Sequence, residues 1–204
     1  MDFQLDAAEA RVLGSLLEKE ATTPEYYPLS LNALVNACNQ KSNREPVVSY
    51  DEDTVEVALE GLRSKGLALR STGRDSRVPK HAQRFTEKFN FGRREGAVLC
   101  VLLLRGPQTT GELRGRTERI YTFDDLEAVE STLHRLAEMG FVKQLPRQPG
   151  TKEPRWAHLM SGDVEVAEVA APVERAPSVD RIGKLEAELA QLRREFDDFR
   201  RRFE

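Results

Sequence analysis

The chain has 204 residues, a formal net charge of −3, 39% apolar residues and 32% charged residues. This composition is typical of a soluble globular protein, and the length allows one large domain or two small ones. No segment approaches the roughly 20 consecutive apolar residues of a membrane span, and no apolar block near the N-terminus resembles a signal peptide. Cys38 and Cys100 lie far apart in apolar helical patterns, so we expect buried, reduced thiols and a cytoplasmic location.

Two helices are predicted near the N-terminus. The first begins after Asp6, because a carboxylate at that position accepts hydrogen bonds from the free backbone N–H groups of the first turn. Its apolar residues have helical spacing and form one buried face: Leu13, Leu16 and Leu17. The second helix begins after Ser30, another residue type that caps helices.

A third helix is predicted from residue 51 to Gly66. Its apolar stripe consists of Val55, Leu59 and Leu62. Gly66 ends the helix, because glycine adopts the left-handed backbone conformation without a steric penalty. Two short strands are predicted after it, over residues 67–69 and 81–85, with a basic loop between them.

This third helix has a counterpart later in the chain. Residues 125–141 (DLEAVESTLHRLAEMGF) repeat residues 51–67 (DEDTVEVALEGLRSKGL) at a fixed offset. The coinciding pairs are Asp51 with Asp125, Val55 with Val129, Glu56 with Glu130, Leu59 with Leu133, Leu62 with Leu136 and Gly66 with Gly140. The same apolar stripe, acidic start and final glycine therefore occur twice.

The other elements of the first copy also recur. A helix with one apolar face is predicted around Val98, Val101 and Leu102. A second helix begins after Thr109, which, like Ser30, lies two residues after a proline. Two short strands are predicted over residues 141–145 and 155–159, separated by a stretch rich in glycine, proline and charged residues.

The order helix, helix, helix, strand, loop, strand is that of a winged-helix domain. We therefore predict a mainly α fold with small β-hairpins, made of two tandem winged-helix domains over residues 1–90 and 91–160. The alternative is two unrelated helical bundles.

The C-terminal part is predicted to contain a flexible linker over residues 161–180 and a coiled-coil helix over residues 181–204. Apolar residues recur at heptad spacing along the helix and form a candidate dimerisation seam: Ile182, Leu185, Leu189, Leu192, Phe196, Phe199 and Phe203. We expect a parallel homodimer. The alternative is an amphipathic helix that packs on its own chain.

Three long motifs carry a resemblance to a known family. They are residues 9–47 (EARVLGSLLEKEATTPEYYPLSLNALVNACNQKSNREPV), residues 102–116 (LLLRGPQTTGELRGR) and residues 149–159 (PGTKEPRWAHL). Through these motifs the chain resembles the YceH-like family of uncharacterised bacterial proteins, from its first residue to about residue 161. The resemblance implies a tandem winged-helix fold and specifies no activity.

Motifs that carry enzyme chemistry are absent from the sequence. It contains no GxxxxGK phosphate-binding loop, no HExxH zinc motif and no GxSxG nucleophile turn. The three histidines, His81, His134 and His158, lack the spacing of metal ligands, and we interpret them as surface or strand residues. We therefore expect no enzymatic activity, no metal and no cofactor.

Basic residues in the predicted wings and turns are candidate phosphate-binding residues for double-stranded DNA. They are Lys41, Arg44, Arg70, Arg74, Arg77, Lys80, Arg114, Arg116, Arg119, Arg147, Lys152 and Arg155. Both third helices begin with acidic residues, which would repel phosphates, so DNA would be contacted by the wings and basic turns. The alternative is that these cations are ordinary solvated surface. Similarly, the polar loop 39–46 is either a recognition loop or an amide-rich loop that bonds to its own backbone.

Two functions agree with these patterns. The first is a DNA-associated regulatory protein that dimerises through its tail and contacts DNA with its wings. The second is a non-enzymatic scaffold that binds other proteins through the third helices and the coiled coil. The fold alone does not choose between them, because one fold supports many functions.

Overall fold

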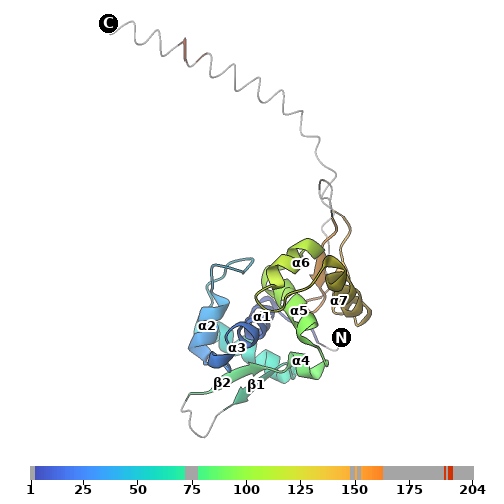
Figure 1. Ribbon diagram of the computed structural model, residues 1–204. Helices are drawn as coiled ribbons and strands as arrows, with labels where there is room; N and C mark the ends of the chain where they lie inside the picture. The colour runs from blue at the N-terminus through green and yellow to red at the C-terminus, as the bar shows by residue number, and fades with distance from the viewer. Residues whose placement is uncertain are drawn as a thin grey trace, which may run out of the picture. The chain divides into compact units, whose positions relative to one another are not determined.

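The structure, a computed structural model, describes residues 3–71, 78–147, 150, 153–162, 191 and 193–194. Residues 1–166 form one compact unit and residues 167–204 a second one, in which Gln191, Arg193 and Arg194 are described as helical. The first unit is mainly helical and carries two small antiparallel sheets of two strands each (Figure 1), which confirms the predicted mainly α class with small β-hairpins. Apart from Ser161, Gly162, Gln191, Arg193 and Arg194, the predicted linker and coiled-coil helix lie outside the described residues. The predicted apolar seam lies entirely outside them.

The same order of elements occurs twice in the first unit. The first set is α1 (Ala7–Thr22), the 3₁₀ turn η1 (Pro24–Tyr26), α2 (Leu31–Cys38), α3 (Glu52–Ser64), β1 (Ala68–Ser71) and β2 (Lys80–Gln83). The second set is α5 (Arg93–Arg105), α6 (Thr110–Thr117), α7 (Leu126–Glu138), β3 (Val142–Gln144) and β4 (Trp156–His158). A short helix, α4 (Phe85–Lys88), connects the two.

The predicted helix caps are confirmed. Asp6, Ser30 and Thr109 each accept a hydrogen bond from the backbone N–H three residues further on, which satisfies one free donor of the first turn. Both predicted terminating glycines have positive φ angles, 68° at Gly66 and 76° at Gly140. Local capping chemistry therefore sets the helix boundaries in both halves.

Each hairpin is widened by one residue from the segment before the second helix of its own half. Leu29 exchanges two backbone hydrogen bonds with His81 of β2, at 3.0 and 2.7 Å. Gln108 exchanges two with Trp156 of β4, also at 3.0 and 2.7 Å. The two halves therefore share this long-range pairing as well as their element order.

The predicted strand 81–85 extends too far, because Phe85 begins α4 instead of ending β2. The side-chain oxygen of Gln83 accepts a hydrogen bond from the backbone N–H of Thr86 at 3.0 Å, which stops the extended conformation there. The Phe85 ring is fully buried, 5.2 Å from the Phe89 ring and 5.8 Å from the Phe141 ring. Burial of this aromatic ring between the halves outweighs its preference for a strand.

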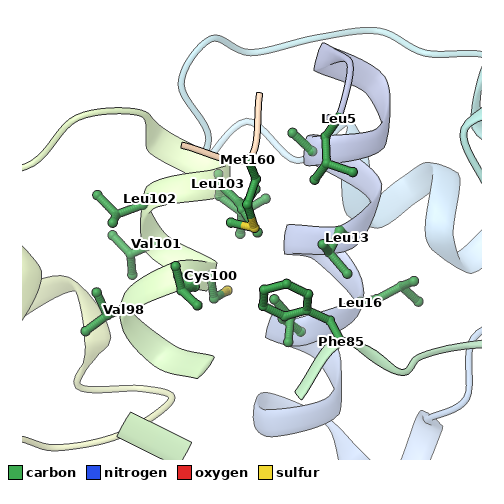
Figure 2. Close-up of a cluster of buried hydrophobic side chains, with 14 of the residues drawn as sticks. Leu5, Leu13, Leu16, Phe85, Val98, Cys100, Val101, Leu102, Leu103 and Met160 are labelled. Carbon is green, nitrogen blue, oxygen red and sulfur yellow. The ribbon is translucent and has the colours of Figure 1, made fainter. Parts of the chain in front are cut away.

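One hydrophobic core runs through both halves, with α1 packed along α5 at its centre (Figures 1 and 2). The helices approach closely at Gly14, where a Cβ atom would lie 2.9 Å from the Leu104 side chain. Figure 2 shows Phe85 between the two helices. Cys38 and Cys100 are free and buried, as predicted.

Candidate functional site

The exposed face of α3 is acidic. Its apolar stripe, predicted from the repeat, is buried on the opposite side of the helix. The exposed residues of the helix are Glu52, Asp53, Glu56, Val57, Glu60 and Ser64. Val57 is 72% exposed in the middle of these carboxylates, so the face combines negative charge with an apolar contact point.

The exposed face of α7 has the same character. Its exposed residues are Leu126, Glu127, Glu130, Ser131, His134, Arg135 and Glu138. The charge of Arg135 is offset, because its Nη1 lies 2.9 Å from Oε1 of Glu95. Leu126, the first residue of the helix, and Met139, the residue just after its last, are exposed apolar side chains. We call the exposed residues of α3 and of α7 the two acidic faces.

Most of the described candidate phosphate-binding residues interact with other groups of the chain. Arg116 and Arg155 both contact the carboxylate of Glu112, at 3.4 and 2.9 Å. Arg119 forms an ion pair with Glu18. Arg114 donates a hydrogen bond to the backbone oxygen of Asp124 at 2.9 Å. These interactions would have to be broken or shared before the side chains could bind phosphate.

Arg44 differs most from its predicted position. Its side chain is fully buried, and its guanidinium donates to both carboxylate oxygens of Glu18, at 3.0 and 2.5 Å. It also donates to the backbone oxygen of Ala37 at 2.9 Å. Arg44 is therefore inaccessible to a phosphate, and Lys41 is the exposed cation of the loop.

The amide side chains of the loop 39–46 take part in hydrogen bonds within the protein. The side chain of Asn39 donates to the backbone oxygen of Tyr50 at 2.7 Å and accepts from its N–H at 2.8 Å. Gln40 and Asn43 accept instead from arginine side chains. The loop also joins the second half, because the Glu45 N–H donates to the oxygen of Leu104 at 2.8 Å. The amides therefore bond to backbone and to arginines, and among these described residues only Asn39 bonds to backbone as the amide-rich alternative describes.

The remaining cations are spread over two hairpins. Arg70 is exposed and Lys80 is half-buried. Both lie at the end of the β1–β2 hairpin where the two strands are joined, and Ser71 lies opposite Lys80 in the register. Arg147 is exposed just after β3. The other three candidates, Arg74, Arg77 and Lys152, lie outside the described residues.

Sequence reasoning missed Glu18, the residue that connects these groups. Its side chain is fully buried, and it pairs with Arg44 of the first half and Arg119 of the second. Lys19 lies 3.4 Å from the same carboxylate. The available signal was weak, since Glu18 directly follows a residue of the predicted apolar face, and helical spacing alone does not reveal a buried ion pair.

His158 gives the fold a pH dependence. Burial lowers the pKa of His158 from 6.5 to about 4. Between pH 6.5 and pH 4 the unfolded chain therefore binds a proton at His158 and the folded chain does not. The contribution of neutral His158 to stability is present above pH 6.5 and is lost as pH falls toward 4. Burial, with the nearby charges of Arg63 and Arg70, lowers the pKa of His81 too, which acts in the same direction.

We expect His158→Met to flatten the pH dependence of stability. Urea unfolding of the wild type should show a loss of about 2–3 kcal/mol from this group between pH 7 and pH 4.5. The control variant His134→Gln removes an exposed histidine and should retain the wild-type profile. A His158→Met profile that is as steep as that of the wild type would contradict the assignment.

Neither a metal-binding cluster nor a membrane-spanning helix is found in the described part of the chain. Among residues 3–71, 78–147 and 153–162, no group of three or more His, Cys, Asp or Glu side chains lies close enough to hold a metal ion. Within the same described segments, no helix has the length and apolar character needed to cross a membrane.

Comparison with known proteins places the chain in a family. A family model described as a protein of unknown function, DUF480, matches residues 5–151. The chain belongs to this family. The DUF480 match includes both acidic faces, the Glu18–Arg44 pair and the loop 39–46.

Its relatives in this family carry the name UPF0502 protein. The chain is 73% identical over 207 residues to the one from Solibacter usitatus, covering 100% of both chains. It is 56% identical to that of Citrifermentans bemidjiense, covering 93% of this chain and 90% of the relative. The relative from Aeromonas hydrophila is 48% identical, with 95% and 93% covered. The YceH-like resemblance agrees with this membership.

Proposed function

We propose that this protein is a non-enzymatic adaptor of two winged-helix domains, over residues 1–90 and 91–160, that binds a protein with a basic surface. The two acidic faces, on the third helix of each domain, form the binding surface. The observation that carries the proposal is their shared character, carboxylates around exposed apolar side chains.

The pairing of Leu29 and Gln108 supports the winged-helix assignment. A winged helix carries a short extended segment between its first two helices, which joins the hairpin formed after the third helix. Leu29 follows α1 and pairs with β2, and Gln108 follows α5 and pairs with β4. This pairing, together with the element order, supports the same winged-helix arrangement for both halves.

Charge favours a protein partner over the DNA major groove. In a winged helix the third helix is the element placed to enter the groove. Here both third helices would bring carboxylates toward phosphates, and like charges at an interface cost several kcal/mol. A basic protein surface would pair with the same carboxylates, while Val57 and Leu126 supply apolar contacts.

The experiment reverses one charge in the middle of each acidic face, in the double variant Glu56→Lys and Glu130→Lys. A matched control, Glu25→Lys and Glu118→Lys, makes the same change in net charge at exposed positions outside α3 and α7. Proteins captured from a bacterial lysate are quantified by mass spectrometry, and circular dichroism checks that each variant folds. We expect one or more proteins to bind the wild type and the control and to bind the face variant at least about tenfold less.

Duplex DNA provides the opposing outcome of the same comparison. Replacing carboxylates by lysines would strengthen contact with phosphates, so a DNA-binding third helix would gain affinity in the face variant. Stronger DNA binding by the face variant, together with unchanged protein capture, would overturn the adaptor proposal.

A DNA-associated regulator is the second candidate, and Arg70 and Lys80 favour it. They lie at the end of the first hairpin where its two strands are joined, and the sequence between the strands contains Arg74 and Arg77. Such a wing could contact the DNA backbone without the third helix. Replacing Arg74, Arg77 and Lys80 by alanine should then reduce the salt dependence of DNA binding, by about 0.9 in log–log slope for each phosphate that the variant no longer neutralises.

The tail is proposed to make the adaptor a homodimer. The heptad seam Ile182 to Phe203 would bury its apolar side chains between two parallel helices. Sedimentation should give a dimer for the full chain at micromolar concentration and a monomer for a chain that ends at Asp180. A monomeric full-length protein would contradict the dimer and favour packing of the tail on its own chain.

A further inference from the structure

A polar cavity of about 320 Å³ lies where the loop 39–46 meets the turn between α5 and α6. Arg105 lines it from the end of α5, Arg116 from α6, and Arg155 from the residue before β4. Glu45 and Glu112 are its acidic residues. The volume is near the lower limit for sites that hold small molecules.

The cationic groups of the cavity outnumber the carboxylates. Glu112 is shared, because Arg155 and Arg116 both contact it and its Oε2 also accepts from the Thr109 N–H at 2.9 Å. Arg105 donates to the neutral side-chain oxygen of Asn43 at 3.0 Å. Burial lowers the pKa of Arg105, and the charges of Arg116 and Arg44 act in the same direction, whereas Glu45 and Glu112 act against it.

Gln108 holds the turn that forms one wall of the cavity. The residue is 3% exposed, and it lines the cavity. Its Nε2 donates toward the backbone oxygens of Arg105, Gly106 and Pro107, at 3.2, 3.3 and 2.9 Å, which fixes the orientation of the amide. The opposite atom, Oε1, is buried, so it offers no accessible acceptor to a ligand.

We propose that this cavity binds a small anion, of the phosphate or carboxylate class. The anionic oxygens contact the guanidinium groups of Arg105 and Arg116. The site is separate from the acidic faces, so it is tested independently of the adaptor function.

Inorganic phosphate is the probe. Isothermal titration of the full chain, in a buffer free of phosphate and sulfate, should show saturable phosphate binding. Arg105→Gln should weaken phosphate binding about tenfold or more, as expected for loss of a charge-assisted hydrogen bond. The control Arg93→Gln changes an exposed arginine at the other end of α5 and should bind as the wild type does.

The melting temperature without ligand shows whether each variant folds, and Arg116→Gln replaces Arg105→Gln if the latter does not. Equal phosphate affinity in the wild type and the arginine variant, or no saturable binding in the wild type, would overturn the site.

Discussion

Replacing Glu18 with alanine is expected to lower the free energy of unfolding by about 3–5 kcal/mol. The side chains of Glu18 and Arg44 are both fully buried, and two hydrogen bonds connect them. Removing the carboxylate leaves a buried guanidinium charge without its counter-ion, and burial already lowers the pKa of Arg44. It also releases Arg119, the partner of this carboxylate from the second half. Urea unfolding at pH 7 measures the loss.

A double-mutant cycle separates the ion pair from general damage to the core. Glu18→Leu should be strongly destabilising, because it leaves the Arg44 charge buried without its counter-ion. Arg44→Met should also be destabilising, because among the described residues Glu18 then keeps only Arg119 and Lys19 as ionic partners. The double variant removes both charges and should be less destabilised than the sum of the two single effects. Additive effects would contradict the coupling, and a Glu18→Ala variant as stable as the wild type would contradict the pair itself.

The local part of the fold could be predicted from the sequence. Capping residues and terminating glycines obey rules that involve only a few neighbouring residues, which is why Asp6, Ser30, Thr109 and Gly66 were assigned correctly. Helical spacing also identified the buried stripe of α3 and its repeat in α7. The prediction placed Phe85 in a strand because a short apolar pattern contains no information about aromatic rings distant in the sequence. The conformation of Phe85 depends on such a ring, that of Phe141.

The candidate site was less accessible to sequence reasoning. A basic residue in a polar loop looks the same whether its side chain faces solvent or a buried carboxylate. Arg44 is buried because Glu18, from another element, balances its charge and the backbone oxygen of Ala37 accepts from the same guanidinium, and this pairing depends on how the loop returns onto α1. The polar cavity was equally hard to predict, because Arg105 and Gln108 line a cavity only when the loop 39–46 packs beside them.

The acidic character of both third helices is visible in the sequence, but its consequence is not. Acidic residues at a helix start are expected for the helix dipole alone. The structure adds that Glu56 and Glu130, beyond the first turn, are also exposed, and that Val57 lies exposed among the carboxylates of α3. Dipole stabilisation does not account for these positions, whereas the proposed basic protein partner would.

Leu59→Ala and Leu133→Ala should each lower the free energy of unfolding by about 2–5 kcal/mol. The two leucines occupy equivalent positions in the repeat, and both are 0% exposed. Truncation removes apolar surface that folding buries and leaves a cavity that the surrounding helices fill only in part, because close-packed side chains relax little. The matched control is Val57→Ala, on the solvent side of the same helix as Leu59, which should change stability by no more than about 0.5 kcal/mol. Chemical denaturation followed by circular dichroism measures all three. Because one core joins both halves, the unfolding transition should shift as a whole in each leucine variant. A leucine variant with the wild-type midpoint would contradict the equivalence of α3 and α7.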